Sequence, residues 1–387
     1  MRRLLNRKLS LADLPEIKQK GQNKPSRSAF FQQKLRSHWP LLTLPWALII
    51  TAVVETILVI AGIALYVVAF EAKQGVIEYT HCTKTNNVSI SSYYSAKYAD
   101  SSSHSSFLAE LRHNETSENK TCFYDIELQE DYNGDVRFYY GLENYYQNTR
   151  FYFRSRNDIQ LQGKKLTMVE DCSPYDYVKD AGNKTTAIAP CGFVANSLFN
   201  DTFTLEYKIN GTQIPVPWTT QGLLDPKIYE KYVNPPIKPG ETLCDAFKGT
   251  KKPIAWHIPP CELDDGDGGI GFQNFDFMIW MQTAALPKFR KLYRALNKTE
   301  DDIFENGLPK GSYVLKITDN YPVDDYDGKK RFIIGIGGLR GQKNYFLPLA
   351  FFTTALGIFF ITVFLLALKC CHCDALESKL QRVAHCF

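Results

Sequence analysis

The sequence predicts a membrane protein with two transmembrane helices and a large α+β ectodomain built mainly on antiparallel β-strands. Two long apolar runs lie near the two ends of the 387-residue chain. Sequons for N-glycosylation and an even number of cysteines lie between these runs. The intervening segment is rich in aromatic residues and in short stretches whose apolar and polar residues alternate, which is typical of half-buried strands.

The two apolar runs are long enough to cross a bilayer. The first covers residues 41–70 and contains one charge, Glu55, and the second covers residues 345–368 and contains none. A span needs roughly 20 apolar residues, and a buried core helix rarely stays apolar on every face over such a length. Because the first run is followed by Glu71-Ala72-Lys73 rather than by small residues, we expect an uncleaved signal anchor.

Basic residues beside the runs predict the orientation of the chain. Residues 1–40 contain ten Lys and Arg but only two acidic residues, and Lys369 directly follows the second run. Positively charged flanks stay on the cytosolic side of a membrane. We therefore expect a cytosolic tail (1–40), transmembrane helix 1 (41–70), a luminal or extracellular domain (71–344), transmembrane helix 2 (345–368) and a cytosolic tail (369–387).

Sequons and cysteines support this orientation independently. Seven Asn-x-Ser/Thr sequons lie between the spans, and none lies in either tail: Asn87, Asn114, Asn119, Asn183, Asn200, Asn210 and Asn297. Six cysteines lie in the same segment, where disulfides persist in an oxidising compartment: Cys82, Cys122, Cys172, Cys191, Cys244 and Cys261. Together they predict a glycosylated, disulfide-bonded ectodomain.

Alternation and turn residues predict the elements of the ectodomain. We expect strands over 122–129, 136–140, 202–209, 312–318 and 331–336, and a hairpin turn at Asn133-Gly134 between the first two. Residues 274–286 and 287–296 are predicted as helices, the second with Pro287 in its first turn. The Ser-rich stretch 91–119 is expected to be a glycosylated loop.

The sequence contains no recognised catalytic signature, phosphate-binding loop or zinc-protease motif, so we expect neither an enzyme nor a cofactor. The formal charge of +4 is too small to indicate nucleic-acid binding. The stretch Asp264-Asp-Gly-Asp-Gly-Gly resembles a calcium loop but has Ile270 and Asp276 where that loop has Gly and Glu. A solvated turn is the favoured reading over a calcium site.

Two features near the membrane are candidate functional sites. Glu55 is a charged residue within a span. Burying a charge in the bilayer costs free energy, so we expect Glu55 to contact a partner helix. The cytosolic cysteines that directly follow the second span are candidates for palmitoylation: Cys370, Cys371 and Cys373. A zinc site with His385 and Cys386, or simple free thiols, are the alternatives.

Several motifs make the chain similar to a known family. They are the segments YGLENYYQNTR (140–150), SRND (155–158), QLQG (160–163), APCGFVANSLFNDT (189–202), FKGTKKP (247–253), WMQTAALPKFRKLY (280–293), NYPV (320–323) and GGLRGQKN (337–344). In this order they resemble the cell-cycle-control-protein-50 family, also called the ligand-effect-modulator family, from about residue 40 to 368. The segment 189–202 is the most specific match.

The resemblance implies a role rather than a reaction. Members of this family are non-catalytic accessory subunits of type-IV P-type ATPases, which move phospholipid toward the cytosolic leaflet. The subunit supports partner folding and exit from the endoplasmic reticulum, and the complex works at the Golgi, endosomes or plasma membrane. The partners implied are this ATPase and membrane lipids.

The resemblance also bears on particular residues. It implies disulfide pairs Cys172–Cys191 and Cys82–Cys122, and Asn200 matches a family sequon. Cys244 and Cys261 are paired as an addition to the family pattern. Glu55 departs from the family's apolar first span.

Two other classes of protein share the predicted topology. A two-span ligand-gated channel would need polar residues along a pore, and the second span offers only Thr353, Thr354 and Thr362. An adhesion or ligand receptor is not distinguished by topology. An ectoenzyme would need a nucleophile and base, and none is visible.

Overall fold

The computed structural model describes residues 28–30, 33–34, 43–80, 82, 107–111, 120–179, 184–336 and 344–371. The chain divides into two compact units, 1–59 with 352–387, and 60–351. The larger unit contains the ectodomain and the adjoining ends of both long helices, and each unit is described by itself.

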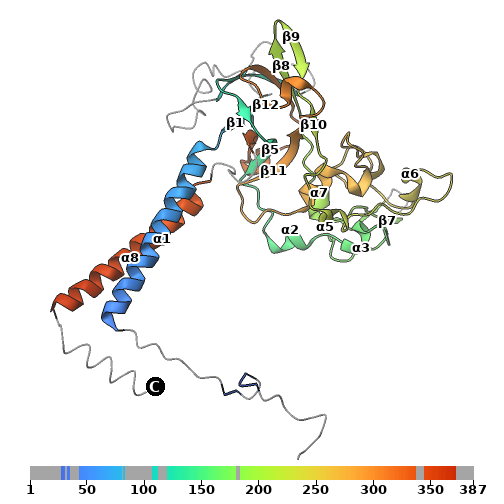
Figure 1. Cartoon of the computed structure of the whole chain (residues 1–387). Coiled ribbons are helices and arrows are strands. Elements are labelled where there is room, and N and C mark those ends of the chain that lie inside the picture. Colours follow the sequence, from blue (N-terminus) through green and yellow to red (C-terminus); the bar gives the residue numbers. More distant parts are fainter. Residues whose placement is uncertain are drawn as a thin grey trace, which may run out of the picture. The chain divides into compact units, whose positions relative to one another are not determined.

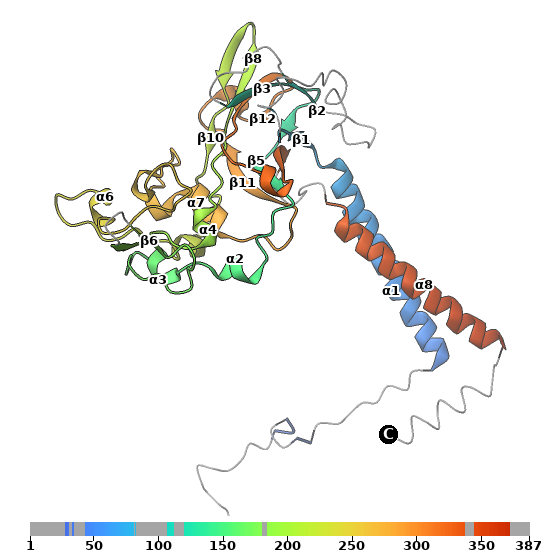
Figure 2. The same cartoon turned by 180° about the vertical axis from the view of Figure 1, so that it is seen from behind.

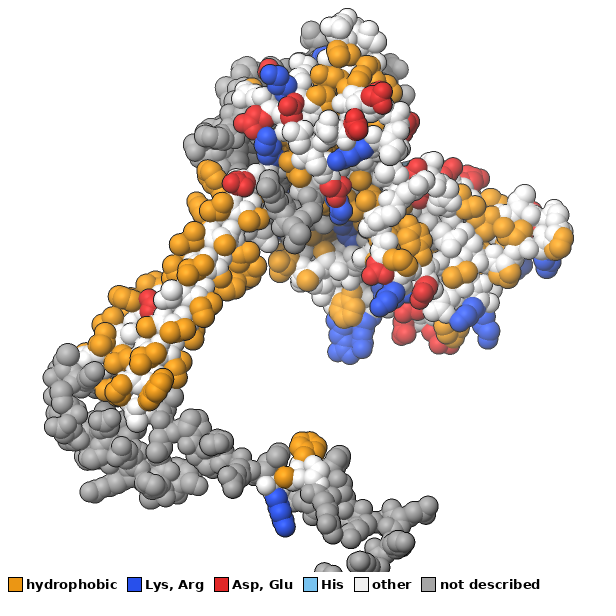
Figure 3. All heavy atoms as spheres, in the orientation of Figure 1, with side chains coloured by type: hydrophobic (Ala, Val, Ile, Leu, Met, Phe, Trp, Pro, Cys, Tyr) orange, Lys and Arg blue, Asp and Glu red, His pale blue; other side chains and the backbone are white. Residues whose placement is uncertain are grey.

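The two apolar runs form the helices α1 (Leu44–Glu71) and α8 (Phe346–Cys371). Both are long and apolar enough to cross a membrane. Hydrophobic side chains cover the helix surfaces visible in Figure 3, whereas charged side chains gather on the ectodomain. Within the larger unit, the rings of Tyr66 and Tyr345 lie 5.8 Å apart, so the adjoining ends of the two helices are in contact.

In the described residues, the ectodomain is built mainly on two five-stranded antiparallel sheets (Figure 1). The first has the order β1-β14-β5-β11-β10, with β1 (Gln74–Glu78), β14 (Lys329–Ile336), β5 (Val136–Glu143), β11 (Phe289–Leu296) and β10 (Trp218–Thr219). The second has the order β2-β3-β13-β8-β9, with β2 (Phe107–Leu111), β3 (Thr121–Leu128), β13 (Gly311–Thr318), β8 (Thr202–Ile209) and β9 (Thr212–Pro215). The strands expected at 202–209, 312–318 and 331–336 are confirmed.

Smaller elements complete the ectodomain. Two-stranded sheets pair β4 (Tyr132–Asn133) with β12 (Gly307–Leu308) and β6 (Tyr177–Lys179) with β7 (Thr185–Ala187). The short helices are α2 (Arg150–Arg154), α3 (Asp158–Leu161), α4 (Phe193–Asn196), α5 (Pro226–Tyr229), α6 (Leu243–Ala246) and α7 (Phe275–Met281). The 3₁₀ turns are η2 (Pro260–Glu262), η3 (Gly271–Gln273), η4 (Asp302–Phe304) and η5 (Asp324–Tyr326). Figure 2 shows α4 beside α7.

Aromatic rings fill the space between the two large sheets. Phe203 of β8 lies 4.9 Å from Phe332 of β14 and 5.6 Å from Tyr79, measured between ring centroids. Phe138 of β5 continues this cluster. Buried aromatic pairs of this kind add stabilisation beyond the area that they bury. The core thus joins strands that are distant in the sequence.

The sequence prediction of a second helix after Pro287 is wrong. Residues 289–296 form strand β11, which pairs with β5 from Phe289↔Leu142 to Ala295↔Arg137. Alternate residues Lys291, Tyr293 and Ala295 are buried, which is the period of a strand rather than that of a helix. The other helix is shorter than expected, because α7 spans Phe275–Met281 and Asn274 caps its amino end.

The expected hairpin at Asn133-Gly134 is also wrong. Gly134 does turn the chain, with a φ of 111° that glycine adopts freely. The strands before and after this turn belong to different sheets, because β3 pairs with β2 and β13 whereas β5 pairs with β14 and β11. The turn therefore carries the chain from one layer of the ectodomain to the other.

Candidate functional site

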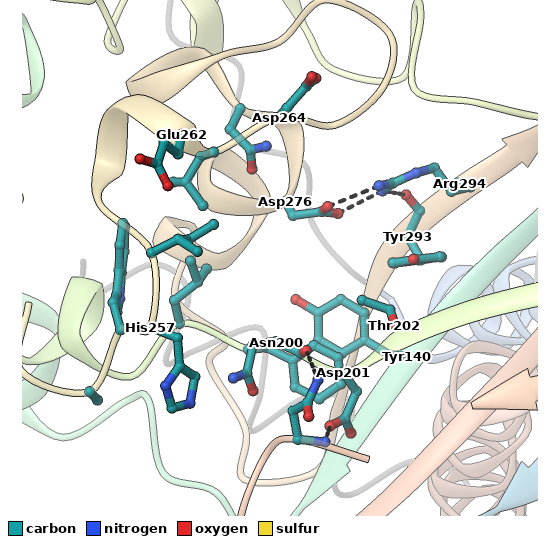
Figure 4. Close-up of a pocket in the computed structure, with 18 residues that line it drawn as sticks. Tyr140, Asn200, Asp201, Thr202, His257, Glu262, Asp264, Asp276, Tyr293 and Arg294 are labelled. Carbon is teal, nitrogen blue, oxygen red and sulfur yellow. Dashed lines mark hydrogen bonds and ion pairs between the residues drawn. The ribbon is translucent and has the colours of Figure 1, made fainter. Parts of the chain in front are cut away.

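A cavity of about 390 Å³ opens where the first residues of β8 meet β5, β11, α7 and the loop 255–264 (Figure 4). Its wall combines apolar side chains with carboxylates, carboxamides and one imidazole. The lining residues are Tyr140, Leu198, Phe199, Asn200, Asp201, Thr202, Ala255, Trp256, His257, Ile258, Glu262, Leu263, Asp264, Asn274, Asp276, Tyr293, Arg294 and Asn320.

An ion pair between α7 and β11 forms one side of the cavity. Arg294 donates from both terminal nitrogens to the two carboxylate oxygens of Asp276, at 2.6 and 2.9 Å, and its guanidinium lies over the ring of Tyr293. Although burial disfavours the charged form, the Asp276 carboxylate raises the pKa of Arg294 above its usual value. The pair is held rigidly, because two parallel charge-assisted hydrogen bonds fix the orientation of both side chains.

A second charged cluster adjoins the cavity and shares Asp201 with its wall. The ammonium of Lys330 donates to Asp201 at 2.8 Å, to the backbone oxygen of Tyr321 at 2.8 Å and to Asp319. Asp201 also accepts from the Tyr79 hydroxyl and from the backbone N–H groups of Asn320 and Tyr321. Burial raises the pKa of Asp201, and the Lys330 ammonium opposes that rise. The cluster ties β14 to the start of β8.

The motif 189–202 serves packing in this structure. Gly192 has a φ of 97°, and a Cβ placed on it would lie 2.0 Å from the backbone oxygen of Ser155, so only glycine fits. The indole N–H groups of Trp256 and Trp280 donate to the backbone oxygens of Ala195 and Val194, at 2.7 and 2.8 Å. The motif thereby positions the chain that enters the cavity at residues 198–202.

The aspartate-rich loop after residue 263 uses its carboxylates to hold its own turn. Asp265 accepts from the backbone N–H groups of Asp267, Gly269 and Phe275. Asp267 accepts from the hydroxyl groups of Thr219 and Thr220 and from the backbone N–H of Thr220. Within the described ranges, no group of three or more His, Cys, Asp or Glu side chains is placed to hold a metal ion.

The segment around α2 exposes large side chains. Phe151 is 86% exposed, Leu286 is 67% exposed and Tyr146 is 53% exposed. Tyr152, which follows Phe151 on α2, points inward instead, and its hydroxyl lies 2.7 Å from that of Ser197. We call this exposed surface the α2 surface; it consists of Tyr146, Arg150, Phe151, Phe153, Arg154 and Leu286.

The six ectodomain cysteines form three disulfides in the structure: Cys82–Cys122, Cys172–Cys191 and Cys244–Cys261. Of the sequons, Asn200, Asn210 and Asn297 are described, whereas Asn87, Asn114, Asn119 and Asn183 lie outside the described residues. Glu55 is half-buried on α1. Cys370 and Cys371 end α8, and Cys373 lies outside the described residues.

Sequence reasoning missed the buried lysines. Lys330 is 1% exposed and lies at an inward position of β14, and Lys291 donates its ammonium to the backbone oxygens of Ile279, Trp280 and Gln282. Burial lowers the pKa of Lys291 to about 7. The sequence pattern did not mark either lysine as buried, because Lys330 lies just outside the strand expected at 331–336 and Lys291 lies in the segment expected to be a helix.

The comparisons with known proteins agree with the fold and with the motifs. The model of the LEM3 (ligand-effect modulator 3) family / CDC50 family matches residues 65–374, which is most of the chain. The chain belongs to this family.

Relatives of the chain span animals and plants. "Cell cycle control protein 50A" of Mus musculus is 35% identical over 362 residues, which cover 89% of each chain. "Cell cycle control protein 50B" of Homo sapiens is 35% identical and covers 86% of this chain and 90% of its own length. "ALA-interacting subunit 3" of Arabidopsis thaliana is 30% identical, with 88% of this chain and 85% of that protein covered. Members of the family are accessory subunits with two membrane spans, and the two-span ectodomain fold is the one expected from the sequence.

Proposed function

We propose that the protein is a non-catalytic accessory subunit of a phospholipid flippase whose ATP-hydrolysing partner is a type-IV P-type ATPase. The observation that supports this most directly is the family match, which covers the ectodomain and reaches into both spans. The name of the Arabidopsis relative describes an interacting subunit. In this role the chain supports folding of the ATPase, its exit from the endoplasmic reticulum, and phospholipid translocation toward the cytosolic leaflet.

The long helices offer surfaces for lipid and for partner helices. Large apolar side chains are exposed along both, including Ile57 at 60% on α1 and Phe360 at 62% on α8. In a bilayer such faces meet lipid or another helix, and close helix packing supplies the association energy. Glu55 lies half-buried within α1, and a polar partner on an ATPase helix would satisfy its carboxyl group.

The α2 surface is our candidate contact for the ATPase outside the membrane. It combines exposed aromatic rings with arginine, the residue types that dominate binding energy at protein interfaces. Asn148 anchors this surface by donating to the backbone oxygen of Ala285 at 3.1 Å, which joins the α2 segment to the loop that carries Leu286. A preformed surface of this kind loses little conformational entropy on binding.

The cavity supports a structural role rather than a reaction. Its strongest charges are already paired, Arg294 with Asp276 and Asp201 with Lys330. A hydrolase site needs a nucleophile within hydrogen-bond reach of a base, and no hydrogen bond joins such a pair among the described lining residues. We assign ATP hydrolysis to the partner on the strength of the family match.

The proposed topology places both termini in the cytosol and the ectodomain in the lumen or outside the cell. The protein is then an integral membrane glycoprotein that leaves the endoplasmic reticulum with its partner for the Golgi, endosomes and plasma membrane. Palmitate on Cys370 and Cys371 at the end of α8, and on Cys373, is part of this proposal. The three disulfides of the ectodomain fit an oxidising compartment.

Depletion of the chain in its own cells tests the role. We expect a type-IV ATPase to stay in the endoplasmic reticulum and uptake of fluorescent phospholipid to fall. The glycans of co-expressed reporter proteins, which serve as the control for general export, should be unaffected. Re-expression of the full chain should restore both, and a chain with Phe151→Asp should restore them less well. Normal ATPase export and lipid uptake in depleted cells would contradict the proposal.

A further inference from the structure

Asn200 is a sequon residue in the wall of the cavity. The sequon is Asn200-Asp201-Thr202, and Asn200 and Thr202 both line the cavity. Asn200 is half-buried, and its carboxamide oxygen is buried without a hydrogen-bond partner in the described structure. Buried polar atoms are nearly always hydrogen-bonded, so this oxygen indicates a missing donor. Figure 4 shows the side-chain amide of Asn200 turned to the same side of the cavity as His257.

The cavity has the size and chemistry of a sugar site. Its volume of about 390 Å³ lies in the lower part of the range of small-molecule sites, roughly 300 to 1,000 Å³. Trp256, Ile258 and Leu263 supply an apolar wall for the C–H face of a pyranose. Glu262 and Asp264 supply carboxylate acceptors for hydroxyl groups.

The cavity also has a rigid frame. The ring of Trp256 is fixed by its hydrogen bond to Ala195 and by an edge contact with Phe277 at 5.9 Å. A sugar brings hydroxyl and acetamido N–H donors, which are what the buried oxygen of Asn200 lacks.

The other described sequons lack these features. Asn210 is exposed at the tip of the β8–β9 hairpin, which projects from the ectodomain in both views (Figures 1 and 2). The carboxamide of Asn297 is already engaged, because it donates to Glu300 and accepts from Thr299. Neither residue lines the cavity. These two sequons therefore offer matched controls for Asn200.

We propose that the cavity is an internal carbohydrate site, occupied by the first N-acetylglucosamine of the glycan on Asn200. The sugar then acts as part of the ectodomain core, joining the start of β8 to the loop 255–264. The glycans on Asn210 and Asn297, in contrast, extend into solvent. The sugar is attached before the domain closes, because Thr202 is already paired with Thr318 in the folded sheet.

Enzymatic trimming of the glycans tests whether the first sugar on Asn200 stabilises the ectodomain from within the cavity or whether the whole glycan acts only at the surface. The full-length chain is produced with high-mannose glycans and purified in detergent, and occupancy is read by peptide mass spectrometry. Endoglycosidase H leaves one N-acetylglucosamine on each Asn, and we expect the Tm to stay within about 1 °C of the untreated chain. The variant Asn200→Gln lacks that sugar and should unfold about 3 °C or more lower, whereas Asn210→Gln should not.

Three further variants distinguish loss of the sugar from a merely structural effect of the Asn200→Gln substitution. Thr202→Ser keeps the sequon and should retain the wild-type Tm, whereas Thr202→Ala loses it and should behave as Asn200→Gln does. Trp256→Leu should destabilise the glycosylated chain more than it destabilises the Asn200→Gln chain, because its sugar contact is absent from the latter. Equal effects in both backgrounds would overturn the proposal.

The inference rests on the proposed luminal placement of the ectodomain. The mass spectra distinguish failure of the carbohydrate site from failure of that placement. A chain with glycan at Asn210 and Asn297 but none at Asn200 overturns the carbohydrate site and leaves the placement standing. A chain with no glycan at any sequon overturns both. Full occupancy of Asn200, combined with the pattern of Tm values above, supports the site.

Discussion

Replacement of Lys330 by Met tests whether the buried charge cluster holds the two sheets together. The side chains of Lys330 and Asp201 are 1% and 0% exposed, and the ammonium makes contacts with Asp201, Asp319 and Tyr321. Met keeps an unbranched apolar side chain, one atom shorter than that of Lys, but removes the charge, which leaves the Asp201 carboxylate without its cation. Removal of one partner of a buried pair costs about 3 to 5 kcal/mol.

Thermal unfolding of the full chain in detergent measures this loss. At about 2 to 4 °C per kcal/mol for a domain of this size, the Tm should fall by roughly 6 to 20 °C. The control is Lys288→Met, because Lys288 is 62% exposed and lies 3.5 Å from Glu143, and such surface pairs contribute at most about 1 kcal/mol. If Lys330→Met lowers the Tm no more than Lys288→Met does, the reasoning fails.

A double variant tests the pairing itself. Asp201→Asn keeps an acceptor for the backbone N–H groups of Asn320 and Tyr321, and it leaves the sequon at Asn200 intact. In the Lys330→Met background it also removes the unpaired charge. The double variant should therefore be more stable than the sum of the two single losses predicts. Additive losses would show that the two side chains do not act as a pair.

Three other changes probe separate parts of the account. Arg294→Lys cannot reproduce the two parallel bonds to Asp276, so it should lower the free energy of unfolding by about 1.5 to 3 kcal/mol in thermal or denaturant unfolding. Replacing Cys244 and Cys261 together by Ser removes a cross-link over 17 residues and should cost about 3 kcal/mol in denaturant unfolding without reductant. Phe151→Asp should reduce recovery of the ATPase in pull-downs at least about fivefold with an unchanged Tm, because the side chain is 86% exposed. An undiminished recovery would remove the α2 surface from the proposed interface.

The parts of the fold that the sequence predicts well depend on local patterns. The spans follow from uninterrupted apolar runs, which need no knowledge of the rest of the chain. Strand β8 begins and ends where the alternation of residues 202–209 does. In this strand, Phe203, Leu205 and Tyr207 face the core while their neighbours face outward, so the period alone identifies it.

The errors arise where a distant partner decides between two local patterns. Residues after Pro287 carry a good helix start signal, and their basic and apolar residues also fit a helix. Pairing with β5, about 150 residues earlier in the chain, makes them a strand instead. The turn at Asn133-Gly134 is a similar case, because its residues specify the bend but not which strand lies beside which.

The cavity shows why a site is harder to predict than a strand. Its walls come from residues 140, 198–202, 255–264, 274–276, 293–294 and 320, and no spacing in the sequence reveals that these segments meet. The sequon at Asn200 was visible, but the burial of its carboxamide oxygen was not. The burial of Lys330 was not predictable either, because two adjacent lysines in a sequence usually indicate solvent-exposed side chains, and only the assembled sheet buries Lys330.

A mild-detergent pull-down of the tagged full-length chain from its own membranes, with mass spectrometry of the recovered proteins, tests the central claim most directly. We predict near-stoichiometric recovery of a type-IV P-type ATPase, which would also identify the partner. Recovery of this chain alone, as a stable homo-oligomer, would contradict the assignment and favour a two-span channel or receptor.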